Sequence, residues 1–183
     1  MLEPNFTPFP EIRTNRLLLR CVTMADAPEI LAMRSNDAVM QFIDREKMKA
    51  LEDAEAFIQL ITTSLESNDG IHWAITLATE SQKLIGLISF WRLIKKHYRA
   101  EIGYMLSPNY WRTGIMKEAI LAVNDFGFKQ IQLHSIEAHI NPANLASAAI
   151  LASTGYVREA YFKEDFCFKG QFIDTAIYSL LEK

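Results

Sequence analysis

Residues 99–120 read RAEIGYMLSPNYWRTGIMKEAI, and this stretch decides the fold of the chain. Its first six residues alternate between apolar and other side chains, as a β-strand does, and a Pro-Asn turn follows the strand. From Ile115 to about Gln130, apolar residues recur at helical spacing. The helix therefore starts soon after a strand, and its cap position offers Gly114 rather than Ser, Asp or Asn.

Such a helix start leaves unpaired backbone amides and the positive end of the helix dipole free for an anion. Gly114 would let a ligand approach the backbone closely, and Arg112 and Lys117 flank it with positive charge. A tight turn with solvated basic residues explains the same stretch equally well, because one glycine is a weak signal. The stretch is no P-loop, which would require a second glycine and a Lys-Ser/Thr pair.

The composition indicates one soluble globular domain over residues 1–183. Of the 183 residues, 50% are hydrophobic and 22% are charged, and the formal net charge is −3. This charge provides no basic face for nucleic acid and favours a cationic amine over a polyanion as substrate. Cys21 and Cys167 match no metal or redox spacing, and no apolar run is long enough to span a bilayer. Because the chain does not open with a secretory signal, we expect a cytoplasmic protein.

The N-terminal half predicts a strand, two helices and an antiparallel meander. The first strand and the two helices that follow are expected at 16–23, 24–36 and 48–67. Three consecutive strands should then form the meander, at 71–79, 83–96 and 99–106.

The C-terminal half predicts a parallel crossover and a closing hairpin. A short strand at 135–140 follows the helix at 115–130, which implies parallel pairing with the strand before that helix. Asn141, with Pro142 in the first turn, should cap a further helix that ends near a left-handed Gly155. Two closing strands are expected at 157–166 and 172–181. The sum is a mixed α/β fold of about seven strands and about four helices.

Three motifs in this order resemble the GNAT superfamily of N-acetyltransferases. SPNYWRTGIMKEAI is similar to the acetyl-CoA pyrophosphate loop of that family, whose motif is Gln/Arg-x-x-Gly-x-Gly/Ala. The preceding AEIGYML and the later NPANLASAAILASTGYVREAYF, with its Asn-x-x-Ser helix, resemble the RimJ/RimL-type branch of ribosomal-protein N-terminal acetyltransferases. KGQFIDTAIYSLLEK is similar to the last strand of that branch. The likeness covers about residues 13–182 and implies a GNAT-like domain whose sheet is splayed between the fourth and fifth strands.

Two residues depart from the pattern of this branch. Arg112 stands where Gly is usual, and Met116 stands where a small residue is frequent. If the backbone at residue 112 requires a positive φ, an Arg there costs roughly 1 kcal/mol. Arg112 would then either distort the loop or supply a direct charge to the pyrophosphate.

The resemblance implies that acetyl-CoA lies between the splayed strands. Its pyrophosphate would meet the loop and the first helical turn, and its pantetheine arm would pair with the end of the preceding strand. Backbone amides near Met105 would polarise the thioester carbonyl, and Asn144 would hold the far end of the arm. The expected cofactor contacts are Tyr104, Met105, Leu106, Trp111, Arg112, Thr113, Gly114, Ile115, Met116, Lys117, Asn141 and Asn144.

Two residues are candidates for the chemistry. Glu101 would lie on the splayed strand and take the proton of the attacking amine, directly or through a water. Its alternative is a solvated strand carboxylate paired with Arg99 or a neighbour. Ser147, three residues after Asn144, would by the family pattern donate to the departing thiolate or bond its sulfur; alternatively, its hydroxyl bonds the helix backbone.

The favoured acceptor is a protein or peptide N-terminal α-amine. An α-amine ionises near pH ~8 and a lysine near ~10.4, so the α-amine requires far less deprotonation at neutral pH. A small amine, such as a polyamine, an aminoglycoside or an amino-acid-like compound, is the alternative acceptor, and a CoA-binding module without turnover is a further alternative. The segment 39–49 could cover the acceptor site with Phe42 and Asp44.

No metal, nucleic acid or membrane partner is expected, and the sequence is compatible with a monomer or a homodimer. The four histidines, His72, His97, His134 and His139, show no metal-ligand spacing. His139 is nevertheless expected on the strand beside the cleft.

Overall fold

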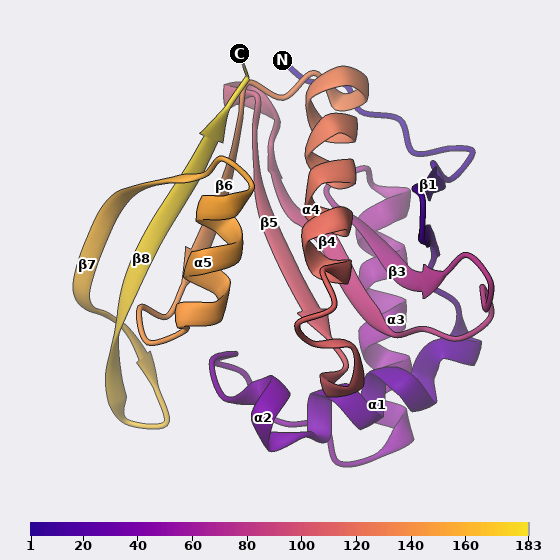
Figure 1. Ribbon diagram of the computed structural model, residues 1–183, viewed down its shortest axis with the longest axis horizontal. Helices are drawn as coiled ribbons and strands as arrows, with labels where there is room; N and C mark the ends of the chain where they lie inside the picture. The colour runs from indigo at the N-terminus through magenta and orange to yellow at the C-terminus, as the bar shows by residue number, and fades with distance from the viewer. Residues whose placement is uncertain (183) are drawn as a thin grey trace.

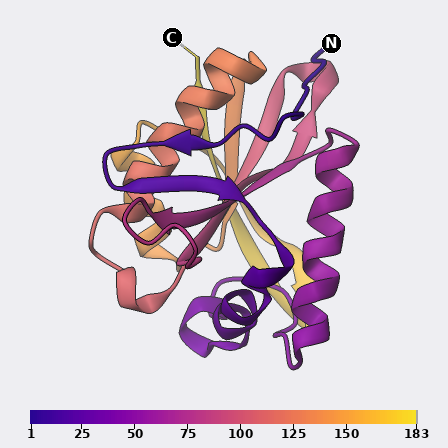
Figure 2. The same cartoon turned by 90° about the vertical axis from the view of Figure 1, so that its right-hand side faces the viewer.

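An eight-stranded sheet forms the centre of the computed structural model, which describes residues 1–182 (Figures 1 and 2). The strand order is β1-β2-β3-β4-β5-β6-β8-β7. All neighbouring pairs are antiparallel except β5 and β6, which run parallel. The strands are β1 Ile12–Arg13, β2 Leu17–Cys21, β3 Ile71–Leu77, β4 Gly86–Ile94, β5 Arg99–Leu106, β6 Ser135–Ile140, β7 Val157–Phe168 and β8 Gln171–Leu181.

Helices cover both faces of the sheet (Figures 1 and 2). On one face, Ile120 of the helix after β5 shares a core with Ile88 of β4. On the other face, Ile30 and Ile58 of the first and third helices pack with Leu87. Because Leu87 and Ile88 are neighbours in one strand, alternate residues supply two separate cores. The helices are α1 Ala27–Ser35, α2 Asp37–Met40, α3 Leu51–Glu66, α4 Ile115–Phe126 and α5 Leu145–Ser153.

The predicted mixed α/β architecture is confirmed, with two short elements added. The seven expected strands correspond to β2 through β8, and β5 and β6 pair in parallel as predicted. The additions are β1 at the edge of the sheet and α2, which Asn36 caps by accepting the amides of Ala38 and Val39. Segments of two to four residues carry no readable periodicity, which is why sequence alone missed both.

Helices α3 and α4 are both shorter than predicted. α3 begins at Leu51 rather than near residue 48, because Asp53 accepts the amides of Lys49 and Ala50 at 2.7 and 3.1 Å just before it. α4 ends at Phe126 and continues as one π-turn through residue 131. A side chain at Gly127 would approach the Phe90 ring to 2.8 Å, so this turn packs its backbone against the sheet.

The cap predicted for α5 is wrong. Its N-cap is Asn144, whose side chain accepts the Ser147 amide at 3.0 Å. Asn141 instead accepts the Ala143 amide at 2.9 Å in the turn before the helix. At the other end Gly155 has the predicted left-handed conformation, with φ +94°. No helix within residues 1–182 is long and apolar enough to cross a membrane.

Candidate active site

Strands β5 and β6 separate after three paired positions, and this separation defines the candidate site. The paired residues are Arg99 with Ser135, Ala100 with Ile136 and Glu101 with Glu137. Beyond these pairs, β5 remains bonded to β4 and β6 remains bonded to β8. Figure 1 shows the two strands diverging toward the bottom of the view, where α5 and the start of α4 lie beside them. We call the space between the unpaired halves of β5 and β6 the gap.

The backbone of β5 turns the amides of Tyr104 and Leu106 toward the gap. The Ser107 amide donates to the Ile85 carbonyl at 2.8 Å, on the β4 side of β5. Because successive strand residues direct their N–H and C=O groups to alternate sides, Met105 also points toward β4. Among the amides near Met105, those of its two neighbours therefore face the gap, and the Met105 amide itself faces β4.

The start of α4 offers further free amides. Gly114 precedes the helix with φ +80°, and its carbonyl accepts the first intrahelical bond, from the Glu118 amide at 3.1 Å. No side chain caps this end of the helix, so the amides of Ile115, Met116 and Lys117 lack intrahelical partners. These amides and the helix dipole form a positive pole with space for an anion.

Arg112 adopts the backbone conformation that favours glycine. Its φ is +61°, in the left-handed region, and its side chain is exposed. A non-glycine residue in this region costs roughly 1–2 kcal/mol. One of the two positions where this chain departs from the family pattern is therefore a position of backbone strain.

The loop before α4 is anchored to the β1–β2 turn by Glu118 and Arg16. The Glu118 carboxylate accepts the Thr14 hydroxyl at 2.6 Å and the Arg16 amide and Nε at 2.9 and 2.6 Å. Arg16 Nη1 in turn donates to the Thr113 carbonyl at 2.9 Å. Burial alone would raise the pKa of Glu118, but the hydrogen bonds from Thr14 and Arg16 outweigh it and lower that pKa. The loop is thus held in place by the protein itself.

Trp111 and Thr113 close the turn between β5 and α4. The Trp111 indole donates to the Leu106 carbonyl at 2.8 Å, and the Thr113 hydroxyl donates to the Tyr110 carbonyl at 2.6 Å. Both residues therefore have a structural role in the loop that presents the helix start.

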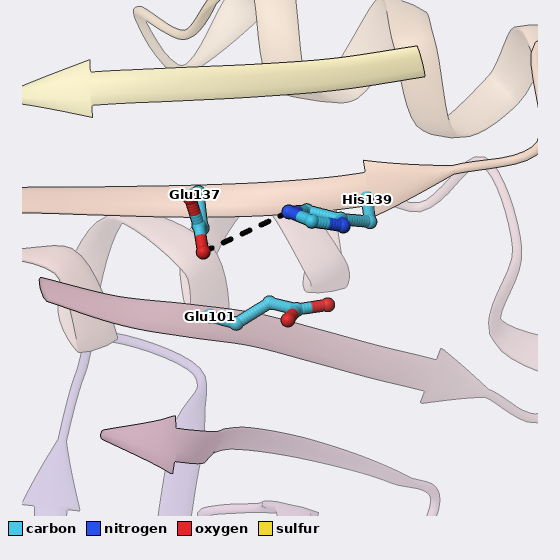
Figure 3. A group of neighbouring side chains, drawn as sticks. All are labelled: Glu101, Glu137 and His139. Carbon is cyan, nitrogen blue, oxygen red and sulfur yellow. Dashed lines mark ion pairs between the residues drawn. The ribbon is translucent and has the colours of Figure 1, made fainter. Parts of the chain in front are cut away.

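Two buried carboxylates and an imidazole meet where the pairing of β5 and β6 ends (Figure 3). Glu101 and Glu137 are directly paired in the register and are only 6% and 5% exposed. Arg99 donates to Glu137, and His139 Nε2 lies 3.7 Å from the other oxygen of that carboxylate. The nearest guanidinium nitrogen to Glu101 belongs to Arg92, at 4.0 Å. Glu137 is thus tightly paired, whereas Glu101 has only a distant cation.

This environment shifts the protonation of Glu101. Burial raises the pKa of the Glu101 carboxyl, and the Glu137 carboxylate raises it further, against the lowering influence of His139 and Arg92. A carboxylate with a raised pKa is a stronger base than an ordinary glutamate, as an acceptor of an amine proton should be. Its side chain lies on the face of β5 opposite Tyr104, as strand alternation predicts.

Glu101, Glu137 and His139 also form the one group within residues 1–182 with metal-ligand spacing. Their ligand atoms lie within 4.8 Å of one another. The ion pair with Arg99 and the proximity of Arg92 already supply positive charge to both carboxylates. These two cations disfavour a further divalent ion at this place.

On the opposite face of β5, Tyr104 and Ser147 link the strand to α5. Their hydroxyl oxygens are 2.6 Å apart, and Ser147 is 7% exposed. Burial raises the pKa of Tyr104 to about 12. The Ser147 hydroxyl therefore bonds a side chain from β5 rather than the helix backbone. Asn144 lies three residues before Ser147, and its side-chain oxygen Oδ1 accepts the Ser147 amide as the cap of α5. Of the Asn144 side-chain amide, the NH₂ group is therefore the part available to a ligand.

The segment after α2 approaches the β7–β8 turn. Lys169 of that turn lies 3.1 Å from Glu46, and burial raises the pKa of the nearby Asp44 in the same segment. Phe42 is half-buried there. A separate pocket of about 310 Å³ lies between α1 and residues 107–110, with Glu29 and Lys83 in its lining, on the β4 side of β5 and outside the gap.

Three features of the site were not foreseen from the sequence. Glu137 could have been noticed because it shares a strand face with His139, but only the register places it opposite Glu101. The Tyr104 hydroxyl bond and the Arg16–Glu118 anchor join residues more than 40 positions apart. No sequence signal specifies such pairs.

Known proteins share the sequence pattern and the fold of this chain. Residues 16–157 match the family model described as an acetyltransferase (GNAT) domain. The chain is 36% identical over 174 residues to the uncharacterized N-acetyltransferase YoaA of Bacillus subtilis (strain 168), covering 95% of this chain and 98% of that protein.

Two solved structures share the fold. One is RimL, a ribosomal L7/L12 α-N-protein acetyltransferase in complex with coenzyme A, with a TM-score of 0.85 and 19% identity over 94% of this chain and 98% of that one. The other is spermidine N-acetyltransferase from Vibrio cholerae in complex with CoA and spermine, with a TM-score of 0.80 and 22% identity over 92% of this chain and 96% of that one.

Proposed function

Because the chain belongs to the GNAT acetyltransferase family and is an acetyl-CoA-dependent N-acetyltransferase, we propose that its acceptor is the α-amine of a protein or peptide N-terminus. The observation that carries this proposal is the buried Glu101 carboxylate at the point where β5 and β6 separate.

The acetyl-CoA site proposed here follows the free backbone groups. The pyrophosphate would be held by the amides at the start of α4, and Arg112 and Lys117 would add positive charge. The pantetheine arm would lie in the gap and bond the free amides of β5, as an added strand does. One of these amides, from Tyr104 or Leu106, would face the thioester oxygen as it gains charge.

The amine would approach from the opposite face of β5, where the buried Glu101 carboxylate lies at the end of the gap. Glu101 would accept the proton that the amine nitrogen loses as it forms the new bond to the acetyl carbon. The two substrates would then meet from opposite faces at the edge of one strand.

The charges around Glu101 favour an acceptor with a single positive group. The carboxylates of Glu101 and Glu137 are offset by the guanidinium groups of Arg92 and Arg99, and Glu137 also faces His139. No surplus of negative charge is therefore present to hold several ammonium groups of a polyamine. An α-amine needs only one such contact, and it loses its proton more readily than a lysine.

Release of free thiol from acetyl-CoA over a panel of acceptors tests this proposal. The panel contains peptides with a free N-terminus, the same peptides with a blocked N-terminus, free lysine derivatives and polyamines. We expect turnover with the free peptides and none with their blocked counterparts. Turnover with polyamines but not with peptides would replace the acceptor proposed here with a small amine.

A further inference from the structure

We propose that Tyr104 is a positioning residue for the leaving group, and that it orients the Ser147 hydroxyl as a hydrogen-bond donor to the sulfur of CoA. The inference rests on the acetyl-CoA site proposed above. In this role, Tyr104 and Ser147 stabilise the departing thiolate and do not deliver a proton to it.

The location of the pair supports this role. Tyr104 lies in the unpaired half of β5, and Ser147 lies in the first turn of α5, so their 2.6 Å contact crosses the line along which the strands separate. Within residues 1–182, this contact joins β5 to α5 through side-chain hydroxyls. A group bound in the gap beside the Tyr104 amide would have both hydroxyls as neighbours.

The direction of this hydrogen bond determines what Ser147 can do. A tyrosine hydroxyl has one proton and is the stronger donor of the two, because phenols are more acidic than aliphatic alcohols. When Tyr104 donates to Ser147 Oγ, the serine proton is free to point toward a third atom. Without Tyr104, the serine hydroxyl would turn to a backbone carbonyl of its own helix, as Ser153 does toward Ile150 at 2.9 Å.

Proton transfer from the pair to the sulfur is unfavourable. The pKa of Tyr104 is raised to about 12 by burial. An ordinary thiol ionises near pH ~8.5, so moving the tyrosine proton to a thiolate is disfavoured by roughly 3,000-fold. An aliphatic hydroxyl is a weaker acid still. The pair therefore keeps its protons and stabilises the negative sulfur by hydrogen bonding.

The reaction balances without an acid at this place. The amine nitrogen forms a bond to the acetyl carbon, the carbon–sulfur bond breaks, and its electron pair stays on the sulfur as a thiolate. The proton lost by the nitrogen goes to Glu101 and then to solvent. Tyr104 and Ser147 begin and end the step protonated.

Titration of the thiol of bound CoA tests this inference directly. Thiolate formation is followed by ultraviolet absorbance in complexes of CoA with the wild-type protein, Tyr104→Phe, Ser147→Ala and the double variant. The wild type should lower the pKa of the bound thiol. The ionisation constant should fall roughly tenfold in Ser147→Ala and roughly three- to tenfold in Tyr104→Phe.

A matched control and a double-variant comparison separate positioning from general destabilisation. Thr76→Val also removes a buried hydroxyl, which donates to the Leu18 carbonyl at 2.8 Å on β2, and it should leave the ionisation of bound CoA unchanged. The double variant should equal Ser147→Ala, because Tyr104 acts through the serine. Equal ionisation constants of the bound thiol in all proteins would overturn the inference. A double variant whose ionisation constant falls by the product of the two single-variant effects would also overturn it, because Tyr104 would then act independently of Ser147.

Kinetics with an active acceptor provide a second readout. Tyr104→Phe should lower kcat roughly three- to tenfold at every pH from neutral to alkaline, with the KM for acetyl-CoA unchanged. If Tyr104 delivered a proton instead of orienting the serine, Tyr104→Phe should lower kcat further than Ser147→Ala does. Because the thiol titration requires no acceptor, its outcome is independent of whether the α-amine is the true substrate.

Discussion

Replacement of Arg112 tests the loop that presents the start of α4. The residue holds φ +61° and has an exposed side chain, so its conformational strain and its charge can be removed separately. Arg112→Ala removes the charge and keeps the left-handed strain, whereas Arg112→Gly removes both. The comparison of these two variants isolates the backbone contribution.

The expected magnitude follows from two opposing effects. A left-handed L-residue costs roughly 1–2 kcal/mol, and glycine loses roughly 0.5–1 kcal/mol through the greater freedom of its unfolded chain. Arg112→Gly should therefore be more stable than Arg112→Ala by about 0.5–1 kcal/mol. For a chain of this length, that difference corresponds to about 1–4 °C in Tm.

Thermal unfolding and acetyl-CoA binding are measured on the same proteins. Thr113→Gly is the matched control, because Thr113 lies outside the left-handed region and should only lose stability. Arg112→Gly with no gain over Arg112→Ala would show that this backbone geometry is not occupied in solution. If the guanidinium contacts the pyrophosphate, both Arg112 variants should bind acetyl-CoA about three- to fivefold more weakly. Equal or tighter binding by Arg112→Gly would mean that the arginine only distorts the loop.

Three further predictions concern residues around the site. Glu101→Gln should lower kcat by roughly 10²–10⁴-fold at neutral pH, and by less at alkaline pH, where the amine is already deprotonated. The same variant should be more stable than the wild type at pH 8. Because the pKa of Glu101 is raised in the folded protein, its protonated form contributes stability below the unfolded pKa, and this stability is lost as pH rises through the folded pKa. A variant that is less stable than the wild type at pH 8 would contradict the assignment. Glu118→Ala should cost about 1–2 kcal/mol of stability in chemical denaturation and weaken acetyl-CoA binding. Because the pKa of Glu118 is lowered in the folded protein, this loss of stability should shrink as pH falls through the folded pKa. A loss that does not change with pH would argue against the ion pair with Arg16. Gly127→Ala should lower stability by about 1–2 kcal/mol, since its Cβ would lie 2.8 Å from Phe90; a gain in Tm would mean that this contact relaxes freely.

Sequence periodicity predicted most of the fold because long amphipathic elements carry their own signal. The apolar stripe of α4 and the alternation in β5 placed Ile120 in a core and Glu101 on the opposite strand face from Tyr104. The same logic failed for α2 and β1, which are too short to show a period.

The site was only partly predictable because its chemistry depends on register and on distant partners. Strand alternation identifies the face of Glu101, but the amide direction that distinguishes Tyr104 from Met105 depends on how β5 pairs with β4. Asn141 and Asn144 both satisfy the sequence rule for a helix cap, and the sequence alone does not show that the helix starts after Asn144. The sequence predicts a strained backbone at Arg112 only if the loop requires a positive φ there, and the structure has such a φ.

The most direct test of the account is a crystal structure of the protein in complex with CoA. We predict that the pyrophosphate binds the amides at the start of α4, that the pantetheine arm bonds Tyr104 and Leu106, and that the sulfur lies within hydrogen-bonding distance of Ser147 Oγ. CoA bound outside the gap, for example in the pocket between α1 and residues 107–110, would contradict the proposed site and the roles assigned to Glu101 and Ser147.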